Sequence, residues 1–400
     1  MSEIKLTPEQ QSIHDSVIDW FKSYSKPYIT VGGFAGTGKS TIVGFITETL
    51  KREFDYLPIA YVAYTGKASL VIKSKVKDLD VNNDYVGTIH SLIYKPILKN
   101  DEVVGWDRVK SLPYSLIVLD EASMVDKEIW EDLASFEIPI LVVGDHGQLS
   151  PISNEQNFSL MLKPDYTLQT IHRQALGNPI IKLSAFVREH GYIPKRIFGK
   201  TAAKFDFENP IVQKIIDKYR YKTDSQILCG MNKTRVKLNN LIRQNNGFQS
   251  HDPYVGEKLI CLKNNKKQFI MNGHIVYLRN IDHKTKFLSE IDISPQGRRR
   301  LDGLVTHRKA FGQTTYTTVA KETHNPKILH NTVYQHEKPL VNLFDFGYAI
   351  SVHKSQGSQF KYVILFEERN FYQSDDEYCR WLYTAVTRAS EKLVVIDNYF

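Results

Sequence analysis

Short runs of apolar residues recur along the chain, and helical amphipathic segments separate them. The runs cover residues 28–31, 59–63, 116–119, 140–143, 227–229, 363–366 and 393–396. Short continuous apolar runs are typical of strands that are buried on both faces of a sheet. The segment 41–54, after the first run, places Ile42, Ile46 and Leu50 on one side of a 3.6-residue period. This pattern predicts a doubly wound α/β fold.

The spacing of the runs predicts two α/β units in tandem, because four runs precede residue 150 and three follow residue 225. A small insertion is expected in the first unit. A β-rich insertion is expected in the second, because short β-type pieces occur at 269–271, 275–278, 314–318 and 332–334. The expected bounds are 1–92 and 113–175 for the first unit, 93–112 for its insertion, 176–255 and 344–400 for the second unit, and 256–343 for its insertion.

The charge of the chain favours a polyanionic partner. Lysines and arginines outnumber aspartates and glutamates by 52 to 44, and 15 basic against 9 acidic residues fall within 251–345. A soluble basic enzyme without such a partner would have the same net charge.

The three cysteines are too few and too dispersed for a disulfide framework, which predicts a reducing compartment. The N-terminal residues are polar, and no run approaches the roughly 18 apolar residues that a membrane span needs. We therefore expect a soluble cytoplasmic protein.

Residues 33–40 form a glycine-rich segment between the first expected strand and the helix that begins near Thr41. They match G-x-x-x-x-G-K-[ST], which chance would give in a chain of this length about one time in a hundred. In such a loop the backbone N–H groups wrap a phosphate, the lysine reaches the β- and γ-phosphates, and the serine binds Mg²⁺. The segment predicts an ATP site formed by Gly33, Gly36, Thr37, Gly38, Lys39, Ser40 and Thr41.

Polar residues follow the next two apolar runs of this unit. Asp120 is expected to hold Mg²⁺ together with Ser40, and Glu121 to orient and deprotonate the attacking water. Alone, two such acids would equally indicate a solvated turn or a helix N-cap. Gln148 is expected beside the γ-phosphate, where a neutral amide can orient water. The Gly-Asp pair that precedes it is an ordinary turn signal.

Taken together, these segments resemble superfamily 1 DNA helicases, in particular the branch with the RecD-like and bacteriophage Dda-like enzymes. The resemblance runs from Leu6 to Arg388 and implies two RecA-like P-loop motor domains that use ATP and Mg²⁺. Residues 6–10 resemble the family's adenine-reading segment, which implies that Gln10 hydrogen-bonds the base. As bare sequence, they form a helix start with Thr7 as N-cap.

Three further segments resemble parts of the family that contact single-stranded DNA. They are residues 63–68 and 88–92 in the first motor and the HKSQG segment, 352–358, in the second. A hydroxyl-rich helix cap would give the first two patterns as well. The resemblance implies DNA contacts by Thr65, Lys67, Thr88, His90, His353 and Lys354, and a nucleotide contact by Gly357.

Two arginines are implied to reach the γ-phosphate across the cleft between the motors. Arg388 lies in the family's last motif, at 382–389, and Arg173 lies within 168–174. A lone arginine is more often a surface ion-pair partner. Many relatives carry a glutamate after the HKSQG segment that contacts the ribose, whereas this chain has Gln359, which puts the strength of that contact in doubt.

The family separates strands with a small insertion in the first motor, which implies a wedge at 93–112. Trp106 is expected at a hairpin tip, because Gly105 and Asp107 flank it. A ring folded into the insertion's own core is an equally good interpretation, and Tyr94 would then be the next candidate.

The second insertion occupies the place where the family often carries an SH3-like barrel. Within it, Arg298, Arg299 and Arg300 are expected in a basic loop, either against the DNA backbone or in solvent. The implied partners are single-stranded DNA, its junctions with duplex, and a single-strand-binding protein or replisome component. We expect a monomer that moves 5′→3′ and binds no membrane.

Two other functions stay open. An RNA helicase is one, because no residue in these motifs visibly reads a 2′-hydroxyl. An ATPase subunit of a larger recombination complex, without motor activity of its own, is the other. The intact set of Lys39, Asp120, Glu121, Gln148 and the two arginines argues against the second alternative.

Overall fold

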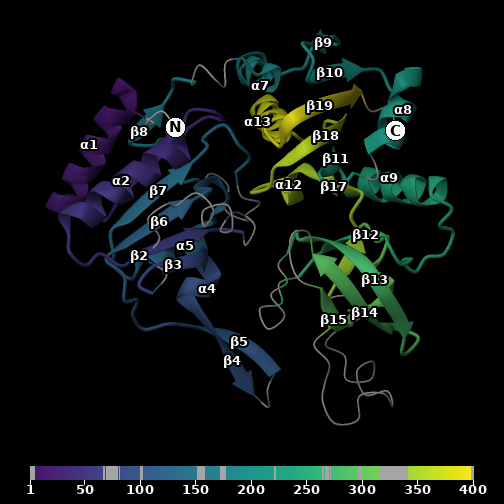
Figure 1. Cartoon of the computed structure of the whole chain (residues 1–400), viewed down its shortest axis with the longest axis horizontal. Helices are drawn as coiled ribbons and strands as arrows, with labels where there is room; N and C mark the ends of the chain where they lie inside the picture. The colour runs from purple at the N-terminus through teal and green to yellow at the C-terminus, as the bar shows by residue number, and fades with distance from the viewer. Residues whose placement is uncertain are drawn as a thin grey trace. The chain divides into compact units, whose positions relative to one another are not determined.

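The computed structural model describes residues 5–65, 68, 80, 82–99, 102–150, 158–171, 177–219, 222–263, 265, 270, 272–295, 300–315 and 341–397, with the backbone alone at 96, 98–99 and 102–106. Two compact units, Met1–His190 and Gly191–Phe400, make up the chain (Figure 1). In the part of the chain that is described, no helix has the length and apolar content that crossing a membrane requires.

A six-stranded parallel sheet, in the order β3-β2-β6-β7-β1-β8, forms the centre of the first unit. Its strands are β1 (Tyr28–Gly33), β2 (Ile59–Ala63), β3 (Tyr85–Thr88), β6 (Leu116–Asp120), β7 (Ile140–Gly144) and β8 (Tyr166–Leu168). The helices among the described residues of this unit are α1 (Pro8–Ser23), α2 (Lys39–Glu53), α4 (Ile89–Ile93), α5 (Lys127–Ala134) and α7 (Pro179–His190). Helix α7 belongs to this unit, whereas the sequence placed the residues from 176 onward in the second unit.

The central strands of this sheet are buried on both faces. In β6, Leu116 and Val118 join the core formed with α1 and α2, whereas Ile117 and Leu119 join the core formed with α4 and α5. Because both faces of the sheet are covered, consecutive residues of the central strands are all apolar. The four apolar runs of this unit are therefore confirmed as strands.

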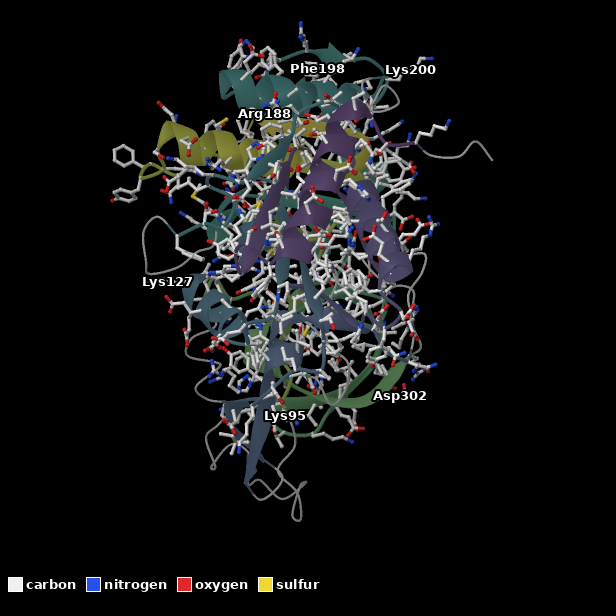
Figure 2. All side chains as sticks on the ribbon, turned by 90° about the vertical axis from the view of Figure 1, so that its left-hand side faces the viewer. Lys95, Lys127, Arg188, Phe198, Lys200 and Asp302 are labelled. Atoms are coloured by element: carbon white, nitrogen blue, oxygen red, sulfur yellow. The ribbon has the colours of Figure 1, made fainter. Side chains whose placement is uncertain are left out.

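A two-stranded antiparallel hairpin follows α4. It consists of β4 (Tyr94–Lys99) and β5 (Glu102–Arg108), and it extends away from the sheet of this unit (Figure 1). Figure 2 labels Lys95 on its first strand and Lys127 at the start of α5. The hairpin lies within the segment that the sequence assigned to the first insertion.

The second unit has its own six-stranded sheet, in the order β17-β11-β18-β19-β10-β9. All neighbours pair in parallel except β9 and β10. The strands are β9 (Ile197–Phe198), β10 (Ala202–Phe205), β11 (Ser225–Cys229), β17 (Ala349–Ser351), β18 (Phe360–Glu367) and β19 (Ala389–Asp397), and the helices are α8 (Pro210–Tyr219), α9 (Asn232–Asn245), α12 (Val352–Ser355) and α13 (Asp375–Val386). The three apolar runs of this unit are thus confirmed as strands.

A five-stranded antiparallel sheet, in the order β15-β14-β13-β12-β16, interrupts the second unit, as the sequence predicts. Its strands are β12 (Lys258–Cys261), β13 (Ile275–His283), β14 (Leu288–Pro295), β15 (Leu301–His307) and β16 (Phe344–Phe346). Of the predicted β-type pieces, 275–278 lies in β13, while 332–334 and most of 269–271 and 314–318 fall outside the described residues.

The end of this insertion differs from the prediction. The sequence placed residue 344 onward in the second α/β unit, but β16 pairs with β12 of the antiparallel sheet. The apolar character of Phe344 and Phe346 is the same in either sheet, so the sequence pattern cannot tell which partner strand they meet.

Buried polar contacts join α9 to the antiparallel sheet. The Arg235 guanidinium pairs with Asp345 of β16, and Arg243 Nε donates to Glu257 at 2.8 Å. Between them along the helix, Asn239 Nδ2 donates to the Phe346 carbonyl at 3.2 Å. Since breaking a buried ion pair by removing one partner typically costs about 3–5 kcal/mol, these contacts fix the insertion to the second α/β sheet.

Candidate functional site

The glycine-rich loop leaves β1 and enters α2, the strand–loop–helix context that the sequence predicts. Gly36 and Gly38 have φ of 82° and 85°, in the left-handed region that favours glycine. A Cβ on Gly33 would lie 2.7 Å from Thr37 Oγ1 and 3.0 Å from Leu168 Cβ, so a larger residue does not fit there. The loop conformation therefore depends on these glycines and leads directly to a helix N-terminus, where anions bind.

Lys39 is held close against this loop. Its Nζ donates to the carbonyl oxygens of Gly33 at 2.6 Å and Phe34 at 3.0 Å. The same nitrogen lies 3.9 Å from Asp145 Oδ2. The ammonium group is thus already positioned over the loop that would surround a phosphate.

The carboxyl ends of β6 and β7 lie beside the loop, because the sheet order is β6-β7-β1. Asp120 is the last residue of β6, and its Oδ1 accepts from the Glu121 N–H at 2.8 Å. Glu121 has φ 53° and ψ 39°, a left-handed conformation that costs a non-glycine residue about 1–3 kcal/mol. Strain of this kind clusters at functional sites, and here it places Glu121 at the same sheet edge as the loop.

Beyond β7, two buried polar side chains contact each other. Asp145 is 1% exposed and accepts from Gly147 N at 3.0 Å and from Gln148 Nε2 at 3.4 Å. Gln148 is 6% exposed, and its Oε1 has no hydrogen-bond partner among the described residues. A buried acceptor of this kind needs a donor, such as a water molecule at the site.

Asp145 is a site residue that the sequence interpretation missed. Its position directly after a buried strand was visible, but a Gly-Asp pair is also a common turn. The contact with Lys39 depends on two neighbouring strands, and the sequence alone does not show which strands are neighbours.

Gln10 lies close to the loop but is engaged by protein atoms. Its Nε2 donates to the Thr37 carbonyl at 3.3 Å, and its Oε1 accepts from Thr7 N at 3.1 Å. Thr7 Oγ1 in turn accepts from Gln10 N, which completes a capping box at the start of α1. The helix start read from the bare sequence is confirmed, and a contact with the base stays a prediction.

The ring of Phe34, within the loop, packs between two side chains. Its centroid lies 4.0 Å from that of His146 and 3.3 Å from Arg188 Cζ of α7. Arg188 is labelled in Figure 2. This stacking ties the loop to the segment after β7 and to α7, and no sequence pattern indicates it.

The hydroxyls predicted to contact DNA in the first unit cap local structure. Thr65 Oγ1 accepts from Ala68 N at 3.2 Å, and Thr88 Oγ1 accepts from Ser91 N at 3.2 Å at the start of α4. His90 packs near the rings of Tyr64 and Tyr94. Thr88 is thus a helix N-cap, DNA contacts by these residues stay predictions, and Lys67 lies outside the described residues.

The structure corrects the position predicted for Trp106. Trp106 pairs with Pro96 inside the hairpin, whereas Lys99 and Glu102 form the pair nearest its tip. A two-stranded hairpin tolerates Gly105 and Asp107 within a strand, because β5 has no third strand with which it must also pair. Trp106 therefore lies nearer the hairpin base, and its side chain is outside the described atoms.

Tyr94 lies at the base of the hairpin, where it is anchored. Its hydroxyl donates to Asp132 of α5, and Arg108, its cross-strand partner, lies 3.6 Å from the same carboxylate. Burial, together with the Asp132 carboxylate, raises the pKa of Tyr94. These contacts favour a structural role for Tyr94 over the wedge role considered from the sequence.

The HKSQG segment forms α12 and the turn after it. His353 is partly buried, and burial lowers its pKa, so the imidazole is neutral at pH 7 and would contact DNA through hydrogen bonds. Lys354 Nζ donates to Asn272 of the antiparallel sheet's loop at 3.1 Å. Gly357 has φ 68°, and Gln359 is exposed immediately before β18.

Arg388 is 3% exposed and bonded within the second unit. Its guanidinium donates to the carbonyl oxygens of Thr384 and Ser358 at 3.0 and 3.1 Å and to Thr387 Oγ1 at 3.2 Å. Reaching a phosphate would require the side chain to exchange these bonds. Arg173 lies outside the described residues.

Only Arg300 of the expected basic loop is described, since Arg298 and Arg299 lie outside the described residues. Arg300 pairs with the half-buried Asp292 and with the exposed Asp302 of the antiparallel sheet. A guanidinium engaged by two carboxylates is a weaker partner for phosphate, which favours the solvated interpretation for Arg300.

Two family models match the chain. The AAA domain model covers residues 5–193, and the UvrD-like helicase C-terminal domain model covers residues 346–396. Among solved structures, the Pif1 helicase from Bacteroides in complex with ADP-AlF3 and ssDNA superposes with a TM-score of 0.56 at 17% identity, over 100% of this chain and 94% of that one. The predicted fold of two RecA-like domains is confirmed by these matches.

Curated relatives share sequence over shorter regions. The ATP-dependent DNA helicase dda of Enterobacteria phage T4 is 26% identical over 292 residues, which is 67% of this chain and 63% of that protein. The ATP-dependent RecD2 DNA helicase of Deinococcus radiodurans is 28% identical over 195 residues, 47% of this chain and 24% of that protein. The alignments thus span less than two thirds of either relative. All of these similarities indicate one family, the superfamily 1 helicases, in the branch that contains the RecD-like and Dda-like enzymes.

Proposed function

We propose that this chain is an ATP-dependent DNA helicase that moves 5′→3′ on single-stranded DNA and unwinds duplex DNA during replication, recombination or repair in the cytoplasm. The observation that carries the proposal is the edge of the first sheet, where Lys39 contacts a glycine loop at a helix N-terminus and Asp120, Glu121 and Gln148 follow the ends of the neighbouring strands. The similarity to DNA helicases named Dda and RecD2 supports DNA as the substrate.

The residues at this edge suit each part of phosphoryl transfer. The loop N–H groups and Lys39 bind the β- and γ-phosphates, Glu121 accepts a proton from water, and Gln148 Oε1 accepts a hydrogen bond from that water. Ser40 and Asp120 supply hydroxyl and carboxylate oxygens, the hard ligands that Mg²⁺ prefers. When bound there, Mg²⁺ neutralises charge on the phosphates.

DNA contacts are proposed for the segments that carry Thr65, Lys67, Thr88, His90, His353 and Lys354. Because the hydroxyls of Thr65 and Thr88 are used as caps, we expect the backbone N–H groups of these segments, and the basic side chains, to bind phosphates of the DNA. The antiparallel insertion is proposed to be SH3-like, and Asn272 connects it to Lys354. The proposed partners are single-stranded DNA, its junctions with duplex, and a single-strand-binding protein or replisome component, with the helicase acting as a monomer.

Steady-state ATPase measurements with DNA and RNA oligomers of the same sequence test the substrate class. We expect DNA to stimulate turnover and RNA to stimulate it less. Stronger stimulation by RNA would favour the RNA helicase, and the absence of turnover with either would favour an inactive subunit of a larger complex.

Replacing Trp106 by alanine is expected to slow strand separation while preserving ATPase activity stimulated by single-stranded DNA. Stacking of one base on an aromatic ring at the junction contributes about 1–3 kcal/mol of free energy. Its loss corresponds to a roughly 5- to 150-fold slower separation of the strands. The measurement is strand displacement on a tailed duplex, with ATP hydrolysis measured in parallel.

Glu131→Ala is the control, because Glu131 forms a surface ion pair with Lys127 on α5, outside the hairpin. It should leave strand displacement unchanged. If Trp106→Ala lowers ATPase activity and thermal stability together, Trp106 has a structural role.

A further inference from the structure

The hairpin of β4 and β5 joins the first unit at its base. Tyr94, the first residue of β4, directly follows α4, and its cross-strand partner Arg108 is the last residue of β5. The Val109 N–H closes the base by donating to the Ile93 carbonyl at 2.9 Å. An isolated two-stranded hairpin is at best marginally stable in water, so its contacts with the rest of the unit determine how it is held.

One carboxylate of α5 contacts both strands at this base. The Tyr94 hydroxyl donates to Asp132 Oδ2, and Arg108 Nη1 lies 3.6 Å from Asp132 Oδ1. Asp132 is half-buried, so water and salt screen these contacts less than they would at the open surface. Hydrogen bonds to an ionised acceptor are stronger than neutral ones. Asp132 therefore connects the two strands of the hairpin to α5.

The helix that carries Asp132 is itself fixed to the sheet of the first unit. Ile129 and Leu133, on either side of Asp132 along α5, are buried in one core with Leu92 of α4 and Ile117 of β6. Close packing in such a core leaves little freedom for the helix to move. Through Asp132, the direction of the hairpin is thus referred to the central sheet of the motor.

The two contacts of Asp132 differ in what remains when the carboxylate is removed. Arg108 has other partners, because its guanidinium also donates to Ser135 Oγ and its Cζ lies 5.6 Å from the ring centroid of Phe136. The hydrogen-bond partner of the Tyr94 hydroxyl among the described residues is Asp132. Loss of this carboxylate therefore releases the β4 side of the base first.

We propose that Asp132 is a positioning residue for the hairpin and that, by holding its direction, it couples ATP hydrolysis to strand separation. The inference rests on the proposed function, because it takes the hairpin as the element at which the DNA strands part. A hairpin that turns at its base moves aside when it meets a base pair, so ATP is hydrolysed without separating the strands. Asp132 acts through Tyr94 and Arg108.

The first test compares strand displacement on a 5′-tailed duplex with ATPase activity at saturating single-stranded DNA. In Asp132→Ala and Tyr94→Phe, displacement should be about 10-fold slower, the change that corresponds to loss of one hydrogen bond to a charged acceptor. ATPase activity should stay close to that of the wild type, because alanine is a good helix former and α5 is retained. Asp132→Asn should lie between, because its amide oxygen still accepts from the Tyr94 hydroxyl.

A matched control and a double variant separate positioning from a merely structural role. Glu131→Ala is the control, because Glu131 is the preceding residue of α5, is exposed and pairs with Lys127 at 3.9 Å. It should unwind DNA like the wild type. Combining Tyr94→Phe with Asp132→Ala should slow displacement no further than Asp132→Ala alone, because the two residues act as a unit. Wild-type displacement by Asp132→Ala, or equal losses of displacement and ATPase activity, would overturn the proposal.

A second measurement does not depend on activity. Spin labels are placed at Ser12→Cys on α1 and at Lys95→Cys on β4 (Figure 2), both exposed positions, after the half-buried Cys379 has been replaced by serine. The distribution of distances between the labels, measured by electron paramagnetic resonance, should be broader with Asp132→Ala than with Glu131→Ala or without either change.

An unchanged width of this distribution overturns the positioning role, even if strand displacement is slow. The proposed function fails in a different way. A wild-type protein that separates no strands, together with the expected broadening in Asp132→Ala, would refute the proposed helicase activity and leave the anchoring of the hairpin by Asp132 in place.

Discussion

Replacement of Lys39 by alanine is expected to lower the DNA-stimulated ATPase rate by at least about 100-fold, as removal of one donor to a developing charge does in other enzymes. Lys39 Nζ contacts the carbonyl oxygens of the glycine-rich loop and lies near Asp145, and no apolar core depends on it. The thermal midpoint should therefore stay within a few degrees of the wild type. Steady-state ATP hydrolysis and thermal unfolding are the two measurements.

Lys22→Ala is the control for this variant. Lys22 forms a surface ion pair with Glu53 on the outer part of the same unit, and exposed pairs of this kind contribute little. Its turnover should match the wild type. ATPase activity of Lys39→Ala within a few-fold of the wild type would refute the assignment of residues 33–40 as the phosphate-binding loop.

Arg388→Ala is expected to have the largest effect on turnover. Arginines that stabilise the transferred phosphoryl group supply about 10³- to 10⁵-fold in rate, and we expect a loss in that range with weak ATP binding retained. Arg173→Ala should behave in the same way. Single-turnover hydrolysis and equilibrium binding of a fluorescent ATP analogue measure the two effects separately.

The buried contacts of Arg388 make a stability control necessary. Its bonds to Ser358, Thr384 and Thr387 join the last residue of the HKSQG segment to the end of α13, so loss of the side chain is also expected to lower stability. Thermal unfolding detects this, and Arg380→Ala, which removes a half-buried arginine of α13 paired with Asp376, is the matched comparison. If ATP binding and turnover fell in equal proportion, Arg388 would bind ATP in its ground state and would not act specifically on the transferred phosphoryl group.

The buried strands of both α/β sheets could be predicted from the sequence because they are covered on both faces. Residues such as Val62 and Val118 lie in successive apolar positions that a solvated loop would not contain. The edge strands were not predicted. β3 and β8 carry half-exposed residues, including Tyr85 and Tyr166, and therefore leave no continuous apolar run.

The glycine-rich loop was predictable because its chemistry is local. Eight consecutive residues carry the glycines, the lysine and the serine that phosphate binding requires, and the strand and helix at its ends are as expected. Asp145 could not be predicted. It lies near Lys39, which comes from another strand–helix segment, and that contact arises only once the sheet order is set.

The hairpin shows a limit of turn signals. Gly105 and Asp107 favour a turn at Trp106, yet the pairing of β4 with β5 places the turn between Lys99 and Glu102. Pairing between two whole strands outweighs the preference of two residues, because each further pair adds backbone hydrogen bonds. Pairing between whole strands also decides where β16 belongs. Its partner is β12 of the antiparallel sheet, which lies far away in sequence.

Strand displacement on duplexes that carry either a 5′ or a 3′ single-stranded tail tests the proposed function most directly. The protein is incubated with each labelled duplex, Mg²⁺ and ATP, and release of the labelled strand is followed with time. Unwinding of the 5′-tailed duplex, with none in the absence of ATP or in Lys39→Ala, is the expected result. ATP hydrolysis without strand release from either duplex, or unwinding restricted to the 3′-tailed duplex, would contradict a 5′→3′ DNA helicase.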